Sequence, residues 1–174
     1  MISFGLVEIR LATELDVSAK WCSWLNDPEV TKYSRQKEKK HTIETQRIFV
    51  SNKINSKNSK LFCIFYKQNH VGVIELNNID LENLSCEVMY LIGNTKLWGK
   101  GLGTYIVDYA VKYAFHVLNL DFIYAGTEYN NYSSQKVLLN NKFKIVDNED
   151  QNIKRNIGKK MFILYKKNSI NKSN

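Results

Sequence analysis

The sequence predicts a single domain that mixes helices and strands, of the α/β or α+β class. Its 174 residues suit one domain, and hydrophobic residues make up 44% of them, enough to bury a core. Apolar runs typical of strands alternate along the chain with apolar stripes at helical spacing. The chain holds one proline and no glycine- or serine-rich linker. We therefore expect residues 1–174 to form one domain, with a polar, frayed tail from about 167 to 174.

The N-terminal third predicts one strand and two helices. Residues 7–12, "VEIRLA", alternate between apolar and polar as a half-buried strand does. Asp16 is expected to cap a helix that ends near Pro28, because proline disfavours helical geometry at the residue before it. The apolar stripe of that helix comprises Val17, Trp21, Trp24 and Leu25. A second helix is expected from Thr42 to about Asn52.

The rest of the chain predicts six strands, two helices and a glycine-rich loop. Residues 61–66 and 71–76 form a hairpin in this reading, and residues 85–92 are the next strand. The loop "WGKGLG" follows at residues 98–103. The helical stripe after it comprises Tyr105, Ile106, Tyr109, Ala110, Tyr113 and Val117. The remaining expected elements are a strand at 122–128, a helix at 133–141 that starts near Ser133 or Ser134, and two closing strands, "FKIV" and "KMFILYK". The order βααβββαβαββ predicts a mixed sheet.

Charge and composition narrow the class of protein. The net charge is +8, which suits anionic partners. No run of 18 apolar residues predicts a membrane span, and Glu8 and Glu14 come too early for a secretory signal, so we expect a cytoplasmic protein without a membrane partner. Cys22, Cys63 and Cys86 are widely spaced, which predicts reduced, buried thiols and no metal site. The tyrosines fall mostly at stripe or strand positions, so no nucleic-acid partner is expected.

The loop at residues 98–103 places three glycines in five positions between a strand and a helix. Glycines let a phosphate approach the backbone, and a helix N-terminus attracts anions. The loop lacks the Lys-Ser or Lys-Thr of a Walker loop. It also lacks the third glycine or alanine of a dinucleotide-binding fingerprint. A phosphate cradle of another kind, or a tight turn that binds nothing, remains.

The hexapeptide resembles the [Q/R]-x-x-G-x-[G/A] loop of the GCN5-related N-acetyltransferase (GNAT) superfamily, with Trp98 in place of Gln or Arg. Three further segments resemble its RimJ/RimL-like branch in the right order. They are "WLNDPEVTKYS" at 24–34, "EVMYLIG" at 87–93 and "NYSSQKVLLNNKF" at 131–143. Two positions depart from the family pattern. Lys142 stands where a glycine is usual, and Leu139 stands at the position assigned to a general-acid tyrosine.

The resemblance implies a central mixed, mostly antiparallel twisted sheet flanked by helices, with strands that splay at the cofactor site. It implies acetyl-CoA as cofactor and coenzyme A as product. Gly101 and Gly103 are expected to bring their N–H groups to the pyrophosphate, and Gly99 to ease the bend after Trp98. The expected cofactor-binding residues are Leu91, Ile92, Gly93, Trp98, Gly99, Lys100, Gly101, Leu102, Gly103, Thr104, Asn131, Ser134 and Lys136.

The chemistry implied is direct acetyl transfer to an amine, which must lose its proton. Glu87 is the first candidate for the base, acting through water, and Glu75 is the second. Main-chain N–H groups around residues 91–93 are expected to stabilise the charge on the thioester oxygen. Ser134 either protonates the leaving thiolate or caps a helix. The Leu139 position leaves the proton donor open.

The acceptor is expected to meet the segment 26–41, through Asn26, Tyr33, Arg35 and His41. An anionic nucleotide-linked amino sugar suits the positive charge better than a polyamine or aminoglycoside does. This segment also resembles that of acetyltransferases in bacterial surface-glycan synthesis. A protein N-terminus is the second candidate acceptor. A non-catalytic module that binds CoA or RNA is the alternative of a different class. The sequence leaves the choice between monomer and homodimer open.

Overall fold

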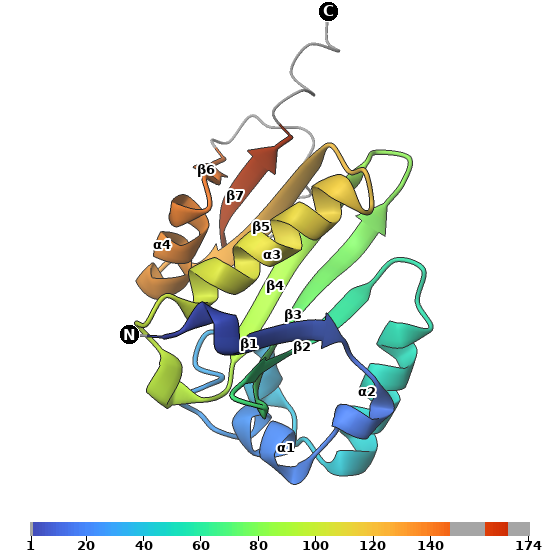
Figure 1. The fold of residues 1–174 in the computed structure, drawn as a ribbon, viewed down its shortest axis with the longest axis vertical. Helices are drawn as coiled ribbons and strands as arrows, with labels where there is room; N and C mark the ends of the chain where they lie inside the picture. Colours follow the sequence, from blue (N-terminus) through green and yellow to red (C-terminus); the bar gives the residue numbers. More distant parts are fainter. Residues whose placement is uncertain (1, 147–158, 167–174) are drawn as a thin grey trace, which may run out of the picture.

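The computed structural model describes residues 2–146 and 159–166. In that part of the chain, the α-helices and strands follow in the predicted order βααβββαβαββ (Figure 1). The strands are β1 Val7–Leu11, β2 Lys60–Tyr66, β3 Asn69–Asp80, β4 Ser85–Ile92, β5 Phe122–Glu128, β6 Lys144–Ile145 and β7 Lys159–Tyr165. The helices are α1 Ala19–Leu25, α2 Ile43–Ile54, α3 Leu102–His116 and α4 Tyr132–Asn140. The tail expected at 167–174 lies outside the described residues.

One sheet joins all these strands in the order β1-β2-β3-β4-β5-β7-β6. Every neighbouring pair is antiparallel except β4 and β5, which confirms a mixed, mostly antiparallel sheet. The parallel pairing is short: only residues 85–87 of β4 pair with residues 122–124 of β5. Beyond Glu87 the two strands no longer pair, although β4 continues to Ile92. This divergence is the splay that the family resemblance implied, and it opens the middle of the sheet.

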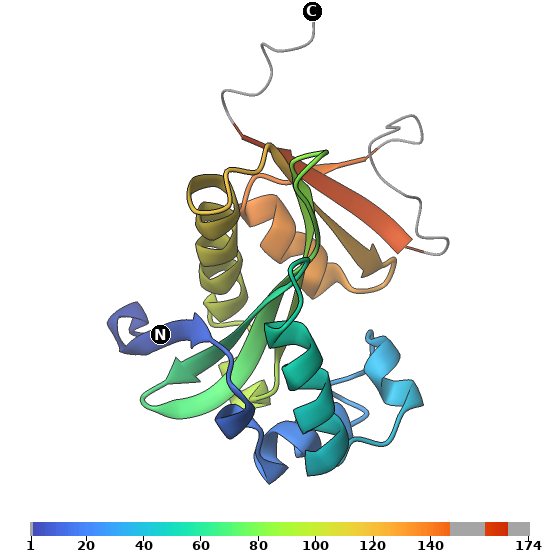
Figure 2. The same cartoon turned by 90° about the vertical axis from the view of Figure 1, so that its right-hand side faces the viewer.

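The two faces of the sheet are covered by different helices (Figure 2). The alternation along β2 sorts the core: Phe62 and Ile64 belong to the cluster with α3 and α4, and Leu61 and Cys63 belong to the cluster with α1 and α2. Because α3 and the α1–α2 segment lie on opposite faces, the splay between β4 and β5 connects their two sides.

The three cysteines are free and buried, as predicted. Burial raises the pKa of the Cys86 thiol to about 12 and shifts the pKa of Cys63 upward as well. Both thiols are therefore protonated near neutral pH and are core residues rather than nucleophiles.

Helix α1 begins later than predicted, and Asp16 does not cap it. The cap is Ser18, whose Oγ accepts a hydrogen bond from the Trp21 N–H at 3.2 Å. Asp16 instead accepts from the Arg10 guanidinium at 2.9 Å and from the Thr13 N–H at 2.8 Å. Only a carboxylate can form the ion pair with Arg10 of β1, so Asp16 is engaged there. Ser18, which directly precedes the first residue of α1, caps the helix instead.

Two expectations about α3 and β3 need correction. Val117 is 58% exposed and lies beyond the end of α3, so it is no part of the buried stripe. Strand β3 runs from Asn69 to Asp80, well past the predicted residues 71–76. Its polar second half, including Asn77, pairs with β4 all the same, because ladder hydrogen bonds need no apolar side chain.

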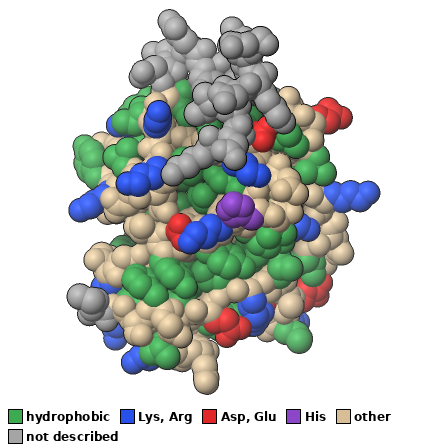
Figure 3. Space-filling model, turned by 45° about the horizontal axis from the view of Figure 1, so that its top comes forward, with side chains coloured by type: hydrophobic (Ala, Val, Ile, Leu, Met, Phe, Trp, Pro, Cys, Tyr) green, Lys and Arg blue, Asp and Glu red, His purple; other side chains and the backbone are tan. Residues whose placement is uncertain are grey.

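The outer surface does not show a basic groove on the face in Figure 3. There, Lys and Arg side chains stand apart from one another beside a band of hydrophobic side chains. None of the helices in the described ranges has the length and apolar character that crossing a bilayer requires.

Candidate active site

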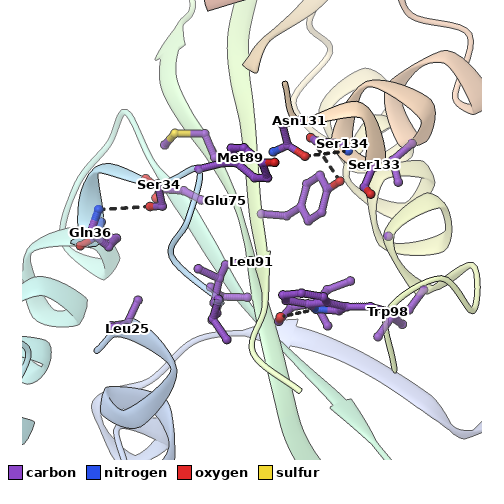
Figure 4. A pocket seen from close by; sticks show the side chains of 18 of the residues that line it. Leu25, Ser34, Gln36, Glu75, Met89, Leu91, Trp98, Asn131, Ser133 and Ser134 are labelled. Carbon is purple, nitrogen blue, oxygen red and sulfur yellow. Dashed lines mark hydrogen bonds between the residues drawn. The ribbon is translucent and has the colours of Figure 1, made fainter. Parts of the chain in front are cut away.

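A cavity of about 980 Å³ extends across the splay and reaches both sides of β4. Figure 4 shows Leu25, Ser34 and Gln36 on one side of β4, and Asn131, Ser133 and Ser134 on the other. We call the first side the acceptor end and the second, with the glycine loop, the cofactor end. The cavity therefore joins the two regions that the sequence assigned to two different substrates.

The loop glycines differ in what their missing side chains allow. Gly99 has φ of +70° and Gly101 has φ of +88°, a left-handed conformation that favours glycine. A Cβ on Gly99 would meet nothing within 4 Å, and one on Gly101 would meet only Phe4 at 3.5 Å. A Cβ on Gly103 would lie 3.0 Å from a methyl of Val137. Gly99 and Gly101 thus keep the rim of the cavity clear, whereas Gly103 also lets α4 pack against α3.

The loop ends at the N-terminus of α3, where backbone donors gather. Gly101 is the N-cap residue and offers no side chain to the first turn, so the N–H groups of Leu102, Gly103 and Thr104 have no intrahelical acceptor. All three residues line the cavity. This arrangement fits a pyrophosphate, because the donors and the helix dipole both favour an anion. Lys136 also lines the cavity.

Lys100, predicted to bind the cofactor, is exposed and is not among the residues that line the cavity.

Trp98 has a specific contact that its family position did not suggest. Its indole N–H donates to the Ile92 carbonyl at 2.8 Å (Figure 4), and the side chain is 40% exposed at the cavity rim. The contact ties the glycine loop to the last residue of β4. Trp98 therefore keeps the loop closed against the splayed strand.

The main-chain donors at the end of β4 are not equivalent. The Gly93 N–H donates to the Val71 carbonyl at 2.9 Å, so it is committed to β3 and Gly93 does not line the cavity. Successive N–H groups of a strand point to opposite sides, so the Leu91 N–H points toward β3 like that of Gly93, and the Ile92 N–H points toward the splay. Of the three residues expected to stabilise the oxygen, the backbone geometry singles out Ile92.

Ser134 is not the cap of α4. The cap is Asn131, whose Oδ1 accepts from the Ser134 N–H at 3.1 Å. The Ser134 Oγ instead accepts a hydrogen bond from the Tyr90 hydroxyl at 3.3 Å, and all three residues line the cavity. Tyr90 was not predicted as a site residue. Its position in a strand of apolar residues predicts a core residue, and its hydrogen-bond partner lies 44 residues away in the sequence, so local spacing gives no signal of the contact.

The two departures from the family pattern have different structural consequences. Lys142 has φ of +68°, so it adopts the left-handed turn that the usual glycine would favour. Leu139 is 47% exposed and does not line the cavity. A tyrosine at that position would face outward in this structure.

Glu75 and Glu87 lie on one face of neighbouring strands, because Glu75 pairs with Met89 and Asn77 pairs with Glu87. Glu75 lines the cavity, and its Oε1 lies 2.6 Å from the Lys53 ammonium and 2.9 Å from the Ser59 hydroxyl. Glu87 is buried beyond the cavity lining, where Asn78 donates to its Oε2 at 3.3 Å.

Burial raises the pKa of Glu87, and the charge of Glu75 adds to the effect; Lys159, Arg35 and the Asn78 amide oppose it. An elevated pKa brings a carboxylate closer to the range in which a general base works best. Glu87 therefore has the environment of a base and Glu75 has the position. For Glu87 to act as the base, a water would have to carry the proton from the cavity to its carboxylate.

The predicted acceptor residues do not all line the cavity. Tyr33 and His41 line the cavity, while Asn26 does not. The Asn26 amide donates to the His41 carbonyl and accepts from the His41 N–H, at 2.8 and 2.9 Å. Asn26 therefore holds the segment in place rather than facing the cavity. Arg35 lies in an adjoining recess of about 290 Å³ together with Lys37 and Lys159.

His70 supports the acceptor end from within the core. Its ring stacks on Phe65 and meets Trp21 and Trp24 edge-on, with centroids 5.0 to 5.1 Å apart. Burial lowers its pKa to about 4. It is a neutral structural residue at pH 7.

Comparison with known proteins places this geometry among acetyltransferases. A family model described as an acetyltransferase (GNAT) domain matches residues 7–144. Acetyltransferase PseH of Campylobacter jejuni is 30% identical over 127 residues, which cover 72% of this chain and 76% of that protein.

Two solved structures have similar folds. RimL, a ribosomal alpha-N-protein acetyltransferase in complex with coenzyme A, gives a TM-score of 0.79 at 18% identity, covering 92% of this chain and 94% of that one. Spermidine N-acetyltransferase from Vibrio cholerae, in complex with CoA and spermine, gives 0.76 at 18% identity, covering 92% and 96%. At this identity the two structures support the fold alone.

Proposed function

This chain belongs to the acetyltransferase (GNAT) family, and we propose that it acetylates the amine of a nucleotide-linked amino sugar. The family and the named relatives support an acetyl-CoA-dependent N-acetyltransferase. The identity of the acceptor is the new part of the proposal. The observation that carries it is the charge around the acceptor end.

Positive charge exceeds negative charge there. Lys39 and Lys40 line the cavity, and Arg35, Lys37 and Lys159 line the adjoining recess. Four acidic residues line the same two cavities, one fewer than these basic residues: Glu29, Glu75, Glu38 and Glu128. The buried Glu87 also lies within the electrostatic reach of Lys159 and Arg35. Glu75 is already balanced by Lys53. An acceptor with a diphosphate would gain from this field, and a polyamine would be repelled by it.

The same end of the cavity offers apolar and aromatic surface. Leu25, Val30, Phe49 and Tyr33 line it. Flat rings pack well against aromatic side chains, and a sugar presents a similar apolar face. A ligand with a ring system and an anionic linker therefore suits both features better than an extended peptide N-terminus does.

The chain's own residues supply the remaining requirements. When bound, acetyl-CoA provides an acetyl group on a thioester that an amine attacks directly. Backbone donors of residues 102–104 would hold the pyrophosphate, and Ile92 at the splay would face the thioester oxygen. Glu87 would accept the amine's proton through a water.

The test is thiol release on mixing the protein with acetyl-CoA and a panel of amines. The panel contains UDP- and dTDP-linked amino sugars, spermidine, an aminoglycoside and a peptide with a free N-terminus. We expect turnover with a nucleotide-linked amino sugar. Turnover confined to spermidine or to the peptide would refute the proposed acceptor, and CoA binding without turnover on any amine would refute catalysis.

A further inference from the structure

We propose that Tyr90 is a positioning residue that acts through Ser134 to deliver a proton to the leaving thiolate of coenzyme A. The inference rests on the proposed acetyl transfer. The inference deepens that proposal by naming a proton donor, because the Leu139 position faces away from the cavity and leaves the donor unassigned. Two observations support it: the hydrogen bonds of Ser134, and the position of Tyr90 on β4.

The contacts of Ser134 leave its own hydroxyl proton to the cavity. A serine hydroxyl is one donor and can accept from others. The 3.3 Å contact joins two hydroxyls, and Ser134 accepts from Tyr90 whenever its own proton points into the cavity. Capping of α4 is done by Asn131, which takes the Ser134 N–H. The serine side chain is thus free of the helix-capping role, and its Oγ contacts the Tyr90 hydroxyl.

Tyr90 reaches Ser134 from the opposite wall of the cavity. It belongs to β4 beyond the point where pairing with β5 ends, and Ser134 belongs to the first turn of α4. The ring is partly buried against the main core cluster, with one edge atom 3.7 Å from where a Gly103 Cβ would be. The 3.3 Å bond is long, and catalytic hydrogen bonds commonly shorten once substrates bind.

The proton balance favours a tyrosine behind the serine. As the carbon–sulfur bond breaks, its electron pair stays on sulfur, Ser134 gives its proton to that sulfur, and Tyr90 gives its proton to Ser134. The amine's proton leaves through the base, and Tyr90 regains a proton from water. The ordinary pKa of a tyrosine, about 10, lies above that of a thiol, about 8.5, and burial raises the pKa of Tyr90 further. Tyr90 is therefore the weaker acid and gives up its proton only in step with the proton that Ser134 gives to sulfur.

Burial raises the pKa of Tyr90, which keeps its hydroxyl protonated across the neutral range. The hydroxyl would thus be ready to donate at every pH at which the enzyme works.

The test compares Tyr90→Phe, Ser134→Ala and the double variant with the wild type. Phenylalanine keeps the ring and its packing. We expect kcat to fall about 10- to 100-fold in each, with KM for acetyl-CoA unchanged within about twofold. The double variant should be no slower than the slower single variant, because the two groups act as one unit. Tyr105→Phe is the matched control, since Tyr105 is a partly buried tyrosine outside the cavity.

A second readout needs no turnover. The thiol pKa of bound coenzyme A, followed through the ultraviolet absorbance of the thiolate, should be lower in the wild type than in Tyr90→Phe by roughly one unit. An equal thiol pKa in both, or additive losses of kcat, would overturn the assignment of Tyr90 while leaving the acetyltransferase intact. A wild-type protein that acetylates no amine would overturn the proposed function, and with it this inference.

Discussion

Asparagine substitutions at Gly99 and Gly101 separate the two roles a loop glycine can have. Both glycines have positive φ, and a Cβ at either would meet at most one side-chain atom of the protein. Asparagine tolerates the left-handed conformation, whereas β-branched valine does not. Gly101→Asn therefore adds a side chain at the cavity rim with little strain, and Gly101→Val adds both a side chain and strain.

The expected magnitudes follow from these contacts. A left-handed non-glycine residue costs about 1–2 kcal/mol, with asparagine at the low end. For a domain of this size, 1 kcal/mol lowers Tm by roughly 2–4 °C. A Cβ that displaces a phosphate from one backbone N–H removes a charge-assisted hydrogen bond of about 1.5–3 kcal/mol. We therefore expect Gly101→Asn to raise KM for acetyl-CoA by about 10- to 100-fold while Tm falls by less than about 4 °C.

The assay pairs steady-state kinetics with thermal unfolding of the same preparations. Gly5→Asn is the control, because a Cβ on Gly5 meets nothing within 4 Å and Gly5 lies outside the cavity. It should change neither quantity. If Gly99→Asn and Gly101→Asn lower Tm but leave cofactor affinity unchanged, the loop is only a tight turn and the phosphate cradle is wrong.

Three further predictions concern single side chains. Glu87→Gln should remove the rise of kcat with pH through the raised pKa of Glu87; if Glu75→Gln removes it instead, Glu75 is the base. The wild type should also lose stability as pH rises through that pKa, because the folded state holds the proton longer, and chemical unfolding of Glu87→Gln should show a flatter profile. The stability contributed by His70 depends on pH in the opposite direction, because its pKa is lowered to about 4. Up to about 3 kcal/mol of unfolding free energy should be lost as pH falls from 6.5 through 4. A His70→Phe variant that unfolds with the same pH dependence as the wild type would contradict this. Trp98→Phe loses the bond to Ile92, so kcat/KM for acetyl-CoA should fall about fivefold; an unchanged value would show that the loop closes without it.

Elements with strong periodicity were predictable from the sequence, and their ends were less so. The helix at Thr42 and the strand at residues 85–92 appear where the pattern placed them. The cap of α1 was misassigned because Asp16 and Ser18 are both good caps, and the choice depends on Arg10 across the turn. Such a choice is made by tertiary contacts that local spacing does not contain.

The candidate site was predictable where one segment carries it and not where two segments meet. The glycine loop could be proposed as the cofactor end from the sequence because its chemistry lies within six residues, and the structure places Gly99, Gly101 and Gly103 in the cavity lining. The pairing of Tyr90 with Ser134 and the packing of Gly103 on Val137 each join residues more than 30 positions apart. A tyrosine in an apolar strand looks like core until the fold shows what its hydroxyl reaches.

The most direct test of the central claim is the ratio of kcat/KM for a nucleotide-linked amino sugar to that for the same amino sugar without its nucleotide. If cations at residues 35–40 and at Lys159 recognise the diphosphate, the ratio should exceed about 100, since two charge-assisted hydrogen bonds contribute about 3 kcal/mol or more. It should also shrink as salt is added. A ratio near one at low salt would contradict the proposed acceptor.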